Sequence, residues 1–160
     1  MYRIGFSRDI HRLEKNNRPF ILGGVNIPFE KGNVSHSDGD CLYHAIAEAL
    51  LGALALGDLG HFFPDNDPKY LNMDSKLILK ECFEMIKKNK YQVNNLDTVI
   101  VLEKPHLQNY LSQIRSNISE ILEVDISQVS VKAQSNEQCG EVGNNSAVVC
   151  FATVLLRKDD

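Results

Sequence analysis

The sequence lacks tryptophan, a C-x-x-C motif and any long apolar run among its 160 residues. Its four cysteines, Cys41, Cys82, Cys139 and Cys150, are widely spaced, which excludes a zinc knuckle and a dithiol redox motif. No segment approaches the roughly 20 apolar residues that a membrane-spanning helix needs. The N-terminus has neither the apolar stretch of a signal peptide nor the composition of a transit peptide. We therefore expect reduced thiols in a cytoplasmic protein that has no membrane partner.

An excess of charge of one sign is also missing. The chain has 17 Lys and Arg residues against 21 Asp and Glu, a net charge of −4, and its basic residues are scattered. Because no basic stripe is present, small molecules are the expected partners and nucleic acid is not. A hydrophobic content of 43% suits a globular protein, and no repeat or linker divides the chain. We expect a single domain over residues 1–160.

Hydrophobic periodicity predicts a protein with both strands and helices. Apolar residues recur at intervals of three and four in the expected helices, and the expected strands are shorter apolar segments. The predicted fold class is α/β, an α+β sandwich in which a mixed four- to five-stranded sheet carries helices on one face. In chain order we expect strands at 2–10 and 20–29, the latter bent at Gly23-Gly24, helices at 40–56 and 75–88, a strand at 96–102, a helix at 111–122, and strands at 129–133 and 147–156.

Three side chains from distant segments form a candidate metal site. Asp9 and His11 stand two residues apart in an expected strand, so both leave the same face. His44 lies on the expected helix 40–56 and shares a face with Asp40 and Glu48, so we expect it to point into a cleft. Asp9, His11 and His44 would leave a fourth tetrahedral position open, which is the pattern of a catalytic zinc site. For Asp9 and His11 alone, a solvated pair near a turn is the structural alternative.

The start of the same helix is a candidate phosphate site. Segment 36–44 gathers two imidazoles, two carboxylates and a glycine, a density that is rarely structural. His36 and Ser37 come just before the helix, where main-chain N–H groups and the positive end of the helix dipole favour an anion. Ser37 also suits a helix N-cap, and the two interpretations are compatible.

Two later segments offer further candidates. The loop 57–68 is rich in Gly, Asp and Pro and is expected to carry function. Its Phe62 and Phe63 could fold over a ligand, whereas Asp65 and Asp67 suit structural turns as well as a site. Near the end of the chain, Glu137 could hold a hard cation such as Mg²⁺ or Mn²⁺ together with substrate phosphates.

Five ordered motifs together resemble one family. From Arg3 to Leu156 the chain is similar to the 2-C-methyl-D-erythritol 2,4-cyclodiphosphate synthases, and the His-Ser-Asp-Gly-Asp-xxx-His block is the most specific part of the resemblance. The motifs are Asp9-x-His11, Gly23-Gly24-Val25-x-Ile27-Pro28, His36-Ser37-Asp38-Gly39-Asp40-xxx-His44, Gly57-Asp58-Leu59-Gly60-xx-Phe63-Pro64-Asp65-x-Asp67-Pro68 and Val131-Lys132-Ala133-xxx-Glu137.

The resemblance implies roles for these residues. It implies Zn²⁺ held by Asp9, His11 and His44, and a second metal, Mg²⁺ or Mn²⁺, held by Glu137. It implies a homotrimer with active sites between subunits, in which one chain supplies the zinc ligands and the next supplies the cytidine pocket. Catalytic roles are implied for His36 and Ser135, and substrate binding is implied for Asp9, His11, His36, Ser37, Asp58, Gly60, Phe63, Asp65, Pro105, Leu107, Ala133 and Ser135.

The implied activity is closure of 4-diphosphocytidyl-2-C-methyl-D-erythritol 2-phosphate to 2-C-methyl-D-erythritol 2,4-cyclodiphosphate with release of CMP, in non-mevalonate isoprenoid biosynthesis. The substrate's 2-phosphate is the nucleophile in this phosphorus–oxygen lyase reaction, so no protein nucleophile is required. Two alternatives stay open. A trimeric scaffold that kept the fold is supported by Ser7-Arg8, Glu141 and Asn144, which replace residues common in the family. A zinc phosphohydrolase acting on another nucleotide would release inorganic phosphate.

Overall fold

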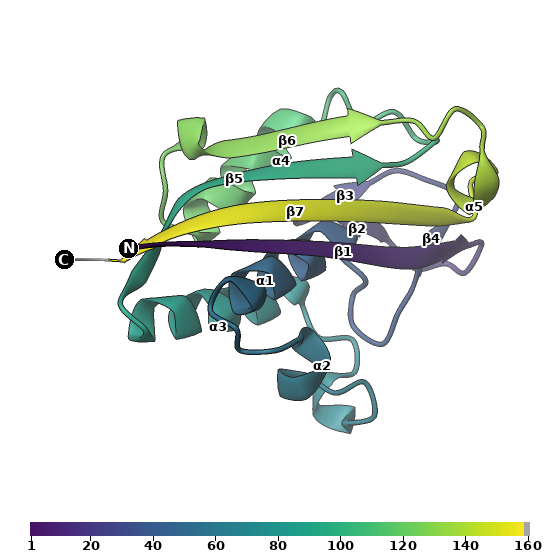
Figure 1. Ribbon diagram of the computed structural model, residues 1–160. Coiled ribbons are helices and arrows are strands. Elements are labelled where there is room, and N and C mark those ends of the chain that lie inside the picture. Colours follow the sequence, from purple (N-terminus) through teal and green to yellow (C-terminus); the bar gives the residue numbers. More distant parts are fainter. Residues whose placement is uncertain (159–160) are drawn as a thin grey trace.

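A computed structural model describes residues 1–158 of the chain (Figure 1). Its centre is a five-stranded sheet with the strand order β4-β1-β7-β5-β6. Strands β5 and β6 are parallel, and the other neighbours are antiparallel, so the sheet is mixed, as predicted. The strands are β1 (Tyr2–Glu14), β4 (Gly32–Val34), β5 (Tyr91–Val101), β6 (Val129–Gln134) and β7 (Ala147–Lys158).

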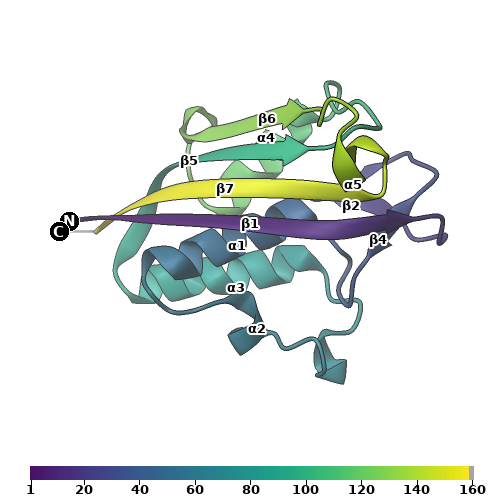
Figure 2. The same ribbon diagram turned by 45° about the vertical axis from the view of Figure 1, so that its right-hand side comes forward.

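Three long helices cover one face of the sheet, which confirms the predicted layers (Figures 1 and 2). Helix α1 packs on β1 and β7, and α4 lies in the crossover between the parallel strands β5 and β6. Within residues 1–158, no helix is long and apolar enough to cross a membrane. The long helices are α1 (Cys41–Ala53), α3 (Ser75–Lys88) and α4 (Leu111–Ile121), and the short ones are α2 (Leu59–Phe62), α5 (Gly140–Gly143) and the 3-10 turns η1 (Pro68–Tyr70) and η2 (Ile126–Gln128).

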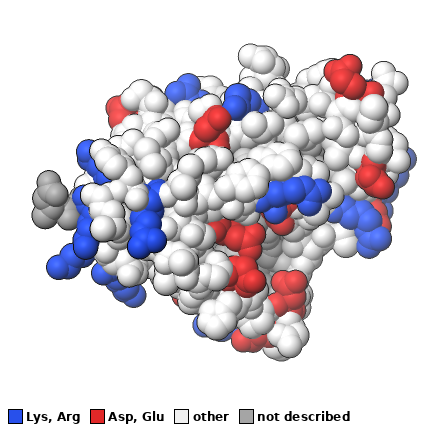
Figure 3. Space-filling model, in the orientation of Figure 1, with Lys and Arg blue, Asp and Glu red and all other residues white. Residues whose placement is uncertain are grey.

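Strand β1 separates an inner row of side chains from an outer row that mixes apolar residues with Arg8 and Arg12, because successive residues of a strand point to opposite faces. The inner residues Gly5, Ser7 and His11 are buried, and β1 packs closely on α1. The outer residues Ile4 and Phe6 are 69% and 66% exposed. Figure 3 shows uncharged atoms over much of the sheet face turned towards the viewer, with a group of Lys or Arg atoms (blue) among them. The sheet therefore has polar groups at its contact with α1 and an apolar surface left uncovered.

Some elements were not predicted. Strand β1 continues to Glu14 and β5 begins at Tyr91, so both are longer than the patterns indicated. Strand β4 and the short helices α2, α5, η1 and η2 span only three or four residues each, too few for periodicity to register.

The segment 20–29, whose bend at Gly23-Gly24 suits a hairpin or a bulge, is a hairpin of β2 (Phe20–Leu22) and β3 (Val25–Ile27). Its turn is Gly23-Gly24, with φ of 55° and 74°, a conformation that favours glycine at both positions. Asp40, the N-cap of α1, accepts hydrogen bonds from the N–H groups of Gly23 at 2.9 Å, Gly24 at 2.8 Å and Tyr43 at 3.1 Å. Asp40 therefore ties the hairpin to the start of α1.

The expectation that Asp40 shares a cleft-facing surface with His44 and Glu48 is wrong. Asp40 is fully buried. As the N-cap it has extended backbone angles, φ −68° and ψ 92°, so its side chain does not follow the spacing of the helix and points elsewhere than His44. Burial raises the pKa of its carboxyl to about 6 against the opposing effect of the backbone N–H donors. His44 and Glu48 do line the pocket described below.

We expect Asp40→Ala to lower the free energy of unfolding by about 3 kcal/mol, because three amide N–H groups lose their acceptor and two of them, those of Gly23 and Tyr43, are buried. Asp74→Ala is the matched control, since Asp74 is an exposed N-cap that accepts from Lys76 alone, and a loss of about 1 kcal/mol is expected. Urea denaturation followed by circular dichroism measures both. Equal losses in the two variants would contradict the linking role of Asp40.

Candidate active site

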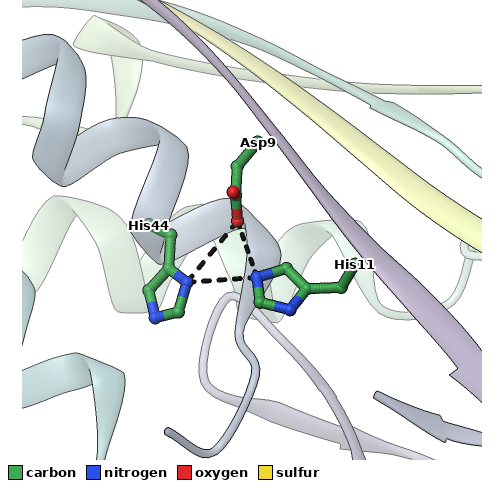
Figure 4. A group of neighbouring side chains, drawn as sticks. All are labelled: Asp9, His11 and His44. Atoms are coloured by element: carbon green, nitrogen blue, oxygen red, sulfur yellow. Dashed lines mark hydrogen bonds and ion pairs between the residues drawn. The ribbon is translucent and has the colours of Figure 1, made fainter. Parts of the chain in front are cut away.

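The three predicted metal ligands meet where β1 contacts α1 (Figure 4). Nε2 of His11 lies 2.7 Å from Oδ2 of Asp9, and Nδ1 of His44 lies 3.5 Å from the same oxygen. The two imidazole nitrogens are 3.2 Å apart. Asp9 and His11 come from the inner row of β1, and His44 comes from the first turns of α1. Spacing along the strand and the helix therefore brings these residues together as predicted.

The geometry of the cluster fits a zinc ion. Tetrahedral ligands about 2.0 Å from zinc lie about 3.3 Å from one another. Two of the separations, 3.5 and 3.2 Å, are close to this value, and the Asp9–His11 separation of 2.7 Å is shorter. Oδ2 of Asp9 is buried and has no hydrogen-bond donor of good geometry among residues 1–158, so a cation would satisfy it. Burial raises the pKa of the Asp9 carboxyl, but the adjoining imidazoles outweigh burial and hold the pKa well below its usual range. An ionised carboxylate with two imidazoles is a donor set that zinc accepts.

His44 is held by groups on the side of the ring away from the cluster. Its Nε2 lies 2.8 Å from Oγ of Ser75 and 3.2 Å from Oγ of Ser37. The Ser75 hydroxyl donates to Oδ1 of Asp38, and the Ser75 N–H donates to Oδ2 at 3.1 Å. Because Asp38 takes the hydroxyl hydrogen, the Ser75 oxygen accepts from Nε2–H. This tautomer leaves the lone pair of Nδ1 directed at Asp9 and His11.

We expect Ser75→Ala to weaken zinc binding by about tenfold, because the imidazole loses the acceptor that fixes its tautomer and orientation. Competition with a chromophoric chelator measures the zinc affinity. Ser119→Ala is a suitable control, since Ser119 lies on α4 and bonds only to the carbonyl of Ser116. An unchanged zinc affinity in Ser75→Ala would show that Ser37 alone suffices to orient the ring.

A pocket of about 370 Å³ opens beside the cluster. The short helix α2 and its loop form one wall, and the segment between β4 and α1 forms another. Glu48, on the α1 turn after His44, also faces it, and its Oε1 accepts from the N–H of Leu59 at 3.3 Å. Of the predicted site residues, the pocket is lined by Asp9, His11, His36, Ser37, His44, Gly60, Phe63 and Asp65.

Asp58 stands at the edge of this arrangement rather than in the wall. Its side chain is exposed and caps α2 by accepting from the N–H of His61 at 3.0 Å. Phe63, by contrast, is buried with its ring packed edge-on against Tyr70. The loop is therefore folded over its own apolar residues and presents the backbone of Gly60 to the pocket.

The segment before α1 offers free backbone donors. Within residues 1–158, the N–H groups of His36 and Ser37 have no acceptor. The His36 ring nitrogen Nε2 lies 3.2 Å from the carbonyl oxygen of Asp67, which fixes the ring beside the pocket wall. The Ser37 hydroxyl is occupied by His44 and by the N–H of Gly39 at 3.2 Å. Anion binding here would therefore use the backbone and the His36 ring before the Ser37 hydroxyl.

The remaining predicted residues lie outside this pocket, near the C-terminal ends of β5 and β6. Ala133, Ser135 and Glu137 are exposed, and Ser135 Oγ donates to Glu137 Oε1 at 2.8 Å. The Leu107 side chain is buried in the core, and Pro105 is half-buried. Glu137 does not join the Asp9 cluster, which is the one candidate metal group found within residues 1–158. A single chain therefore brings together the metal ligands and the phosphate segment, whereas the candidate cytidine segment and Glu137 lie elsewhere.

Sequence reasoning missed three groups that surround the site. Ser75 and Asp38 are 37 residues apart and meet only through the fold. Tyr70, on η1, lines the pocket although nothing in its neighbourhood marked it. Glu48, by contrast, was predicted to share the helix face of His44, because it stands four residues further along the chain, and both residues line the pocket.

A carboxylate and two imidazoles beside free backbone donors define a protein with a candidate metal site in a pocket that could accept an anion. The YgbB family model matches residues 2–157. The chain is 46% identical over 160 residues to the 2-C-methyl-D-erythritol 2,4-cyclodiphosphate synthase of Leptospira borgpetersenii serovar Hardjo-bovis, with 99% of each protein covered. The chain therefore belongs to the YgbB family, that of the 2-C-methyl-D-erythritol 2,4-cyclodiphosphate synthases.

Solved structures share the fold along the whole chain. The IspF protein of Plasmodium falciparum, solved as a CDP complex, is 36% identical with a TM-score of 0.87, covering 99% of this chain and 97% of that one. The bifunctional IspDF of Campylobacter jejuni is 32% identical with a TM-score of 0.95. That match covers 100% of this chain but 43% of the longer protein, so it concerns one part of it. The resemblance inferred from the motifs is confirmed.

Proposed function

We propose that the pocket around Asp9, His11 and His44 converts 4-diphosphocytidyl-2-C-methyl-D-erythritol 2-phosphate to 2-C-methyl-D-erythritol 2,4-cyclodiphosphate with release of CMP. Family membership gives the chain this synthase activity, a phosphorus–oxygen lyase reaction of non-mevalonate isoprenoid biosynthesis. The observation that carries the proposal is the convergence of three metal-donor atoms in one pocket with His36 and Ser37.

The reaction is an intramolecular displacement at phosphorus. An oxygen of the 2-phosphate forms a bond to the β-phosphorus. The bond from the β-phosphorus to the oxygen that bridges it to the α-phosphate breaks, and CMP leaves with that oxygen and the bonding electrons. Both partners belong to one substrate and both are anionic. The protein therefore has to hold them in line and offset their repulsion, which is mainly a task of positioning and charge.

We assign the pocket residues to this task. The free N–H groups of His36 and Ser37 and the His36 ring would bind phosphate oxygens. Gly60, with Asp58 at the rim, would bind the methylerythritol portion, and Phe63 and Asp65 would complete that wall. His36 and Ser135 are the residues to which we assign catalytic roles, through contact with the phosphates at the reacting centre.

Two cations complete the proposal. Asp9, His11 and His44 would hold Zn²⁺, and Glu137 together with substrate phosphates would hold Mg²⁺ or Mn²⁺. When bound, such ions supply positive charge that offsets the phosphate oxygens. Two ligands are in the form that a metal needs. The low pKa of Asp9 keeps its carboxylate ionised, and Ser75 fixes the His44 tautomer.

The test is incubation of pure protein with the cytidine-linked substrate, Zn²⁺ and Mg²⁺, with CMP measured by chromatography and the cyclic product by phosphorus NMR. We expect equal amounts of CMP and cyclic diphosphate. CMP at background level with stoichiometric zinc would support the scaffold alternative instead. Release of inorganic phosphate without a cyclic product would support the phosphohydrolase alternative.

We also propose that the chain acts as a homotrimer whose active sites lie between subunits. Pro105, Leu107, Ala133 and Ser135, the candidate cytidine segment, lie outside the zinc pocket of their own chain, so a neighbour would have to supply them. The uncovered face of the sheet supports such an assembly. Phe6 is 66% exposed, and its ring stacks on Phe151 of β7 with the ring centres 6.2 Å apart. Contiguous exposed apolar surface of this kind marks a protein interface.

A charged residue at the centre of this face should separate the subunits. We expect wild-type protein to sediment as a trimer and Phe6→Asp to sediment as monomers that bind zinc but release no CMP. Ile126→Asp is the matched control, since Ile126 is a 43% exposed apolar residue on η2, away from the sheet face. Analytical ultracentrifugation gives the masses. A monomeric wild type with full activity would contradict the proposal.

A further inference from the structure

Arg18 contacts the candidate phosphate-binding segment through its backbone. Its Nη1 donates to the carbonyl oxygen of Ser35 at 2.6 Å, and its Nη2 donates to the carbonyl oxygen of Ser37. These carbonyls stand on either side of His36. In a trans peptide the N–H points opposite to the C=O. The N–H of His36, which shares a peptide with the Ser35 carbonyl, therefore points away from Arg18.

The second free donor is fixed in the same way. The N–H of Ser37 shares a peptide with the carbonyl of His36, and that carbonyl accepts from the N–H of Asn72 at 2.7 Å. Arg18 and Asn72 together thus orient two consecutive peptides. Ser35, His36 and Ser37 all line the pocket, so the two peptides that Arg18 and Asn72 orient belong to the pocket wall.

A tight turn places Arg18 for this contact. Asn16 accepts from the Arg18 N–H at 3.1 Å, and its own amide donates to the carbonyls of Gly32 at 3.5 Å and Asn33 at 3.4 Å. A Cβ on Gly32 would lie 2.3 Å from the Arg18 carbonyl oxygen, so the turn packs directly on β4. Strand β4 leads straight into Ser35. The position of Arg18 relative to the phosphate segment is therefore set by contacts that involve no ligand.

The charge of Arg18 is not neutralised by a carboxylate. Within the described part of the chain, residues 1–158, no ion pair involves it, although Arg12 and Lys15 nearby each have one. Arg18 is half-buried, and among the described residues its guanidinium donates to the carbonyl oxygens of Ser35 and Ser37 and to no other acceptor. A positive charge in such a place acts over a longer range than one on a solvated side chain, because water and salt screen it less.

We infer that Arg18 is a positioning residue for phosphate binding, which fixes the His36 peptide and adds a positive charge behind it. The inference rests on the proposed function, because the anion it serves is the substrate's phosphate. Arg18 touches neither the metal ligands nor, by its place behind the segment, the substrate itself. Its loss should therefore weaken substrate binding while leaving the metal site and the chemical step in place.

The test compares Arg18→Met, which keeps the apolar stem but neither donor nor charge, with Arg18→Lys, which keeps the charge and one donor. We expect Arg18→Met to raise KM by about tenfold with kcat within about twofold of wild type, and Arg18→Lys to lie between them. Zinc content should be unchanged. KM should depend less steeply on salt in Arg18→Met than in wild type, a readout that a purely structural role would not move.

Arg115→Met is the matched control. Arg115 also donates to two backbone carbonyls, those of Val129 and Ile126, both at 2.8 Å, but it lies on α4 away from the pocket. It should lose stability without a change in KM. Hydrogen exchange needs no turnover. Faster exchange at the Asn72 amide in Arg18→Met, whose N–H donates to the His36 carbonyl at 2.7 Å, therefore tests whether Arg18 holds this segment in place even if wild-type protein released no CMP. An unchanged KM and exchange rate, or a joint fall of kcat, zinc content and melting temperature, would overturn the inference.

Discussion

Replacement of His44 by alanine is expected to remove zinc and CMP release together. The His44 ring supplies one of three donor atoms, and the remaining pair, Asp9 and His11, holds a cation far more weakly than a set of three. We expect less than about a tenth of the wild-type zinc after dialysis and a turnover lower by about 10³-fold or more. Elemental analysis and CMP chromatography on the same preparation measure both quantities.

The variant His36→Ala distinguishes the loss of metal binding from the loss of phosphate binding. Its ring lies in the same pocket but outside the cluster of donor atoms, so this variant should keep its zinc and lose activity through weaker substrate binding. Circular dichroism on both variants excludes unfolding as the cause. Full zinc occupancy in His44→Ala, with affinity equal to wild type, would show that the cluster of Asp9, His11 and His44 is not the metal site.

Local spacing explains why the metal cluster was predictable. Asp9 and His11 follow the two-residue period of a strand, and His44 follows the period of a helix away from its apolar side. Once β1 packs on α1, the side chains of these two rows face each other at the contact between the strand and the helix. The same spacing argument failed at Asp40, because the residue before a helix does not share its geometry. Periodicity is therefore informative inside an element and unreliable at its ends.

Residues that act through long-range contacts could not be predicted from the sequence around them. Ser75 reaches His44, and Arg18 reaches Ser35, only after distant segments have packed together. Ser75 suits a helix start, and Arg18 follows Asn16 and Asn17, which suit a turn, so the local sequence gives each position a sufficient explanation. The cytidine segment around Ser135 is a different case. Motif resemblance predicted it, but the fold of one chain does not bring it to the zinc pocket, so its role stays a prediction that depends on a second subunit.

The contact of β1 with α1 itself depends on Gly5. Its φ is not in the left-handed region, so backbone freedom is not the reason for glycine here. A Cβ at this position would lie 1.9 Å from the carbonyl oxygen of Ala49 and 2.8 Å from the nitrogen of Ala53, both backbone atoms of α1. Such atoms cannot rotate aside, so the strand would have to move off the helix.

We expect Gly5→Ala to lower the free energy of unfolding by more than about 3 kcal/mol and to weaken zinc binding, because Asp9 and His11 move with the strand while His44 stays on the helix. Gly52→Ala is the matched control, since Gly52 lies in α1 with nothing near its Cβ position. That variant should gain about 0.5–1 kcal/mol from better helix propensity. Urea unfolding and chelator competition measure both effects. A Gly5→Ala protein with wild-type stability would mean that the strand and helix can separate without loss, and the metal cluster would then have no fixed geometry.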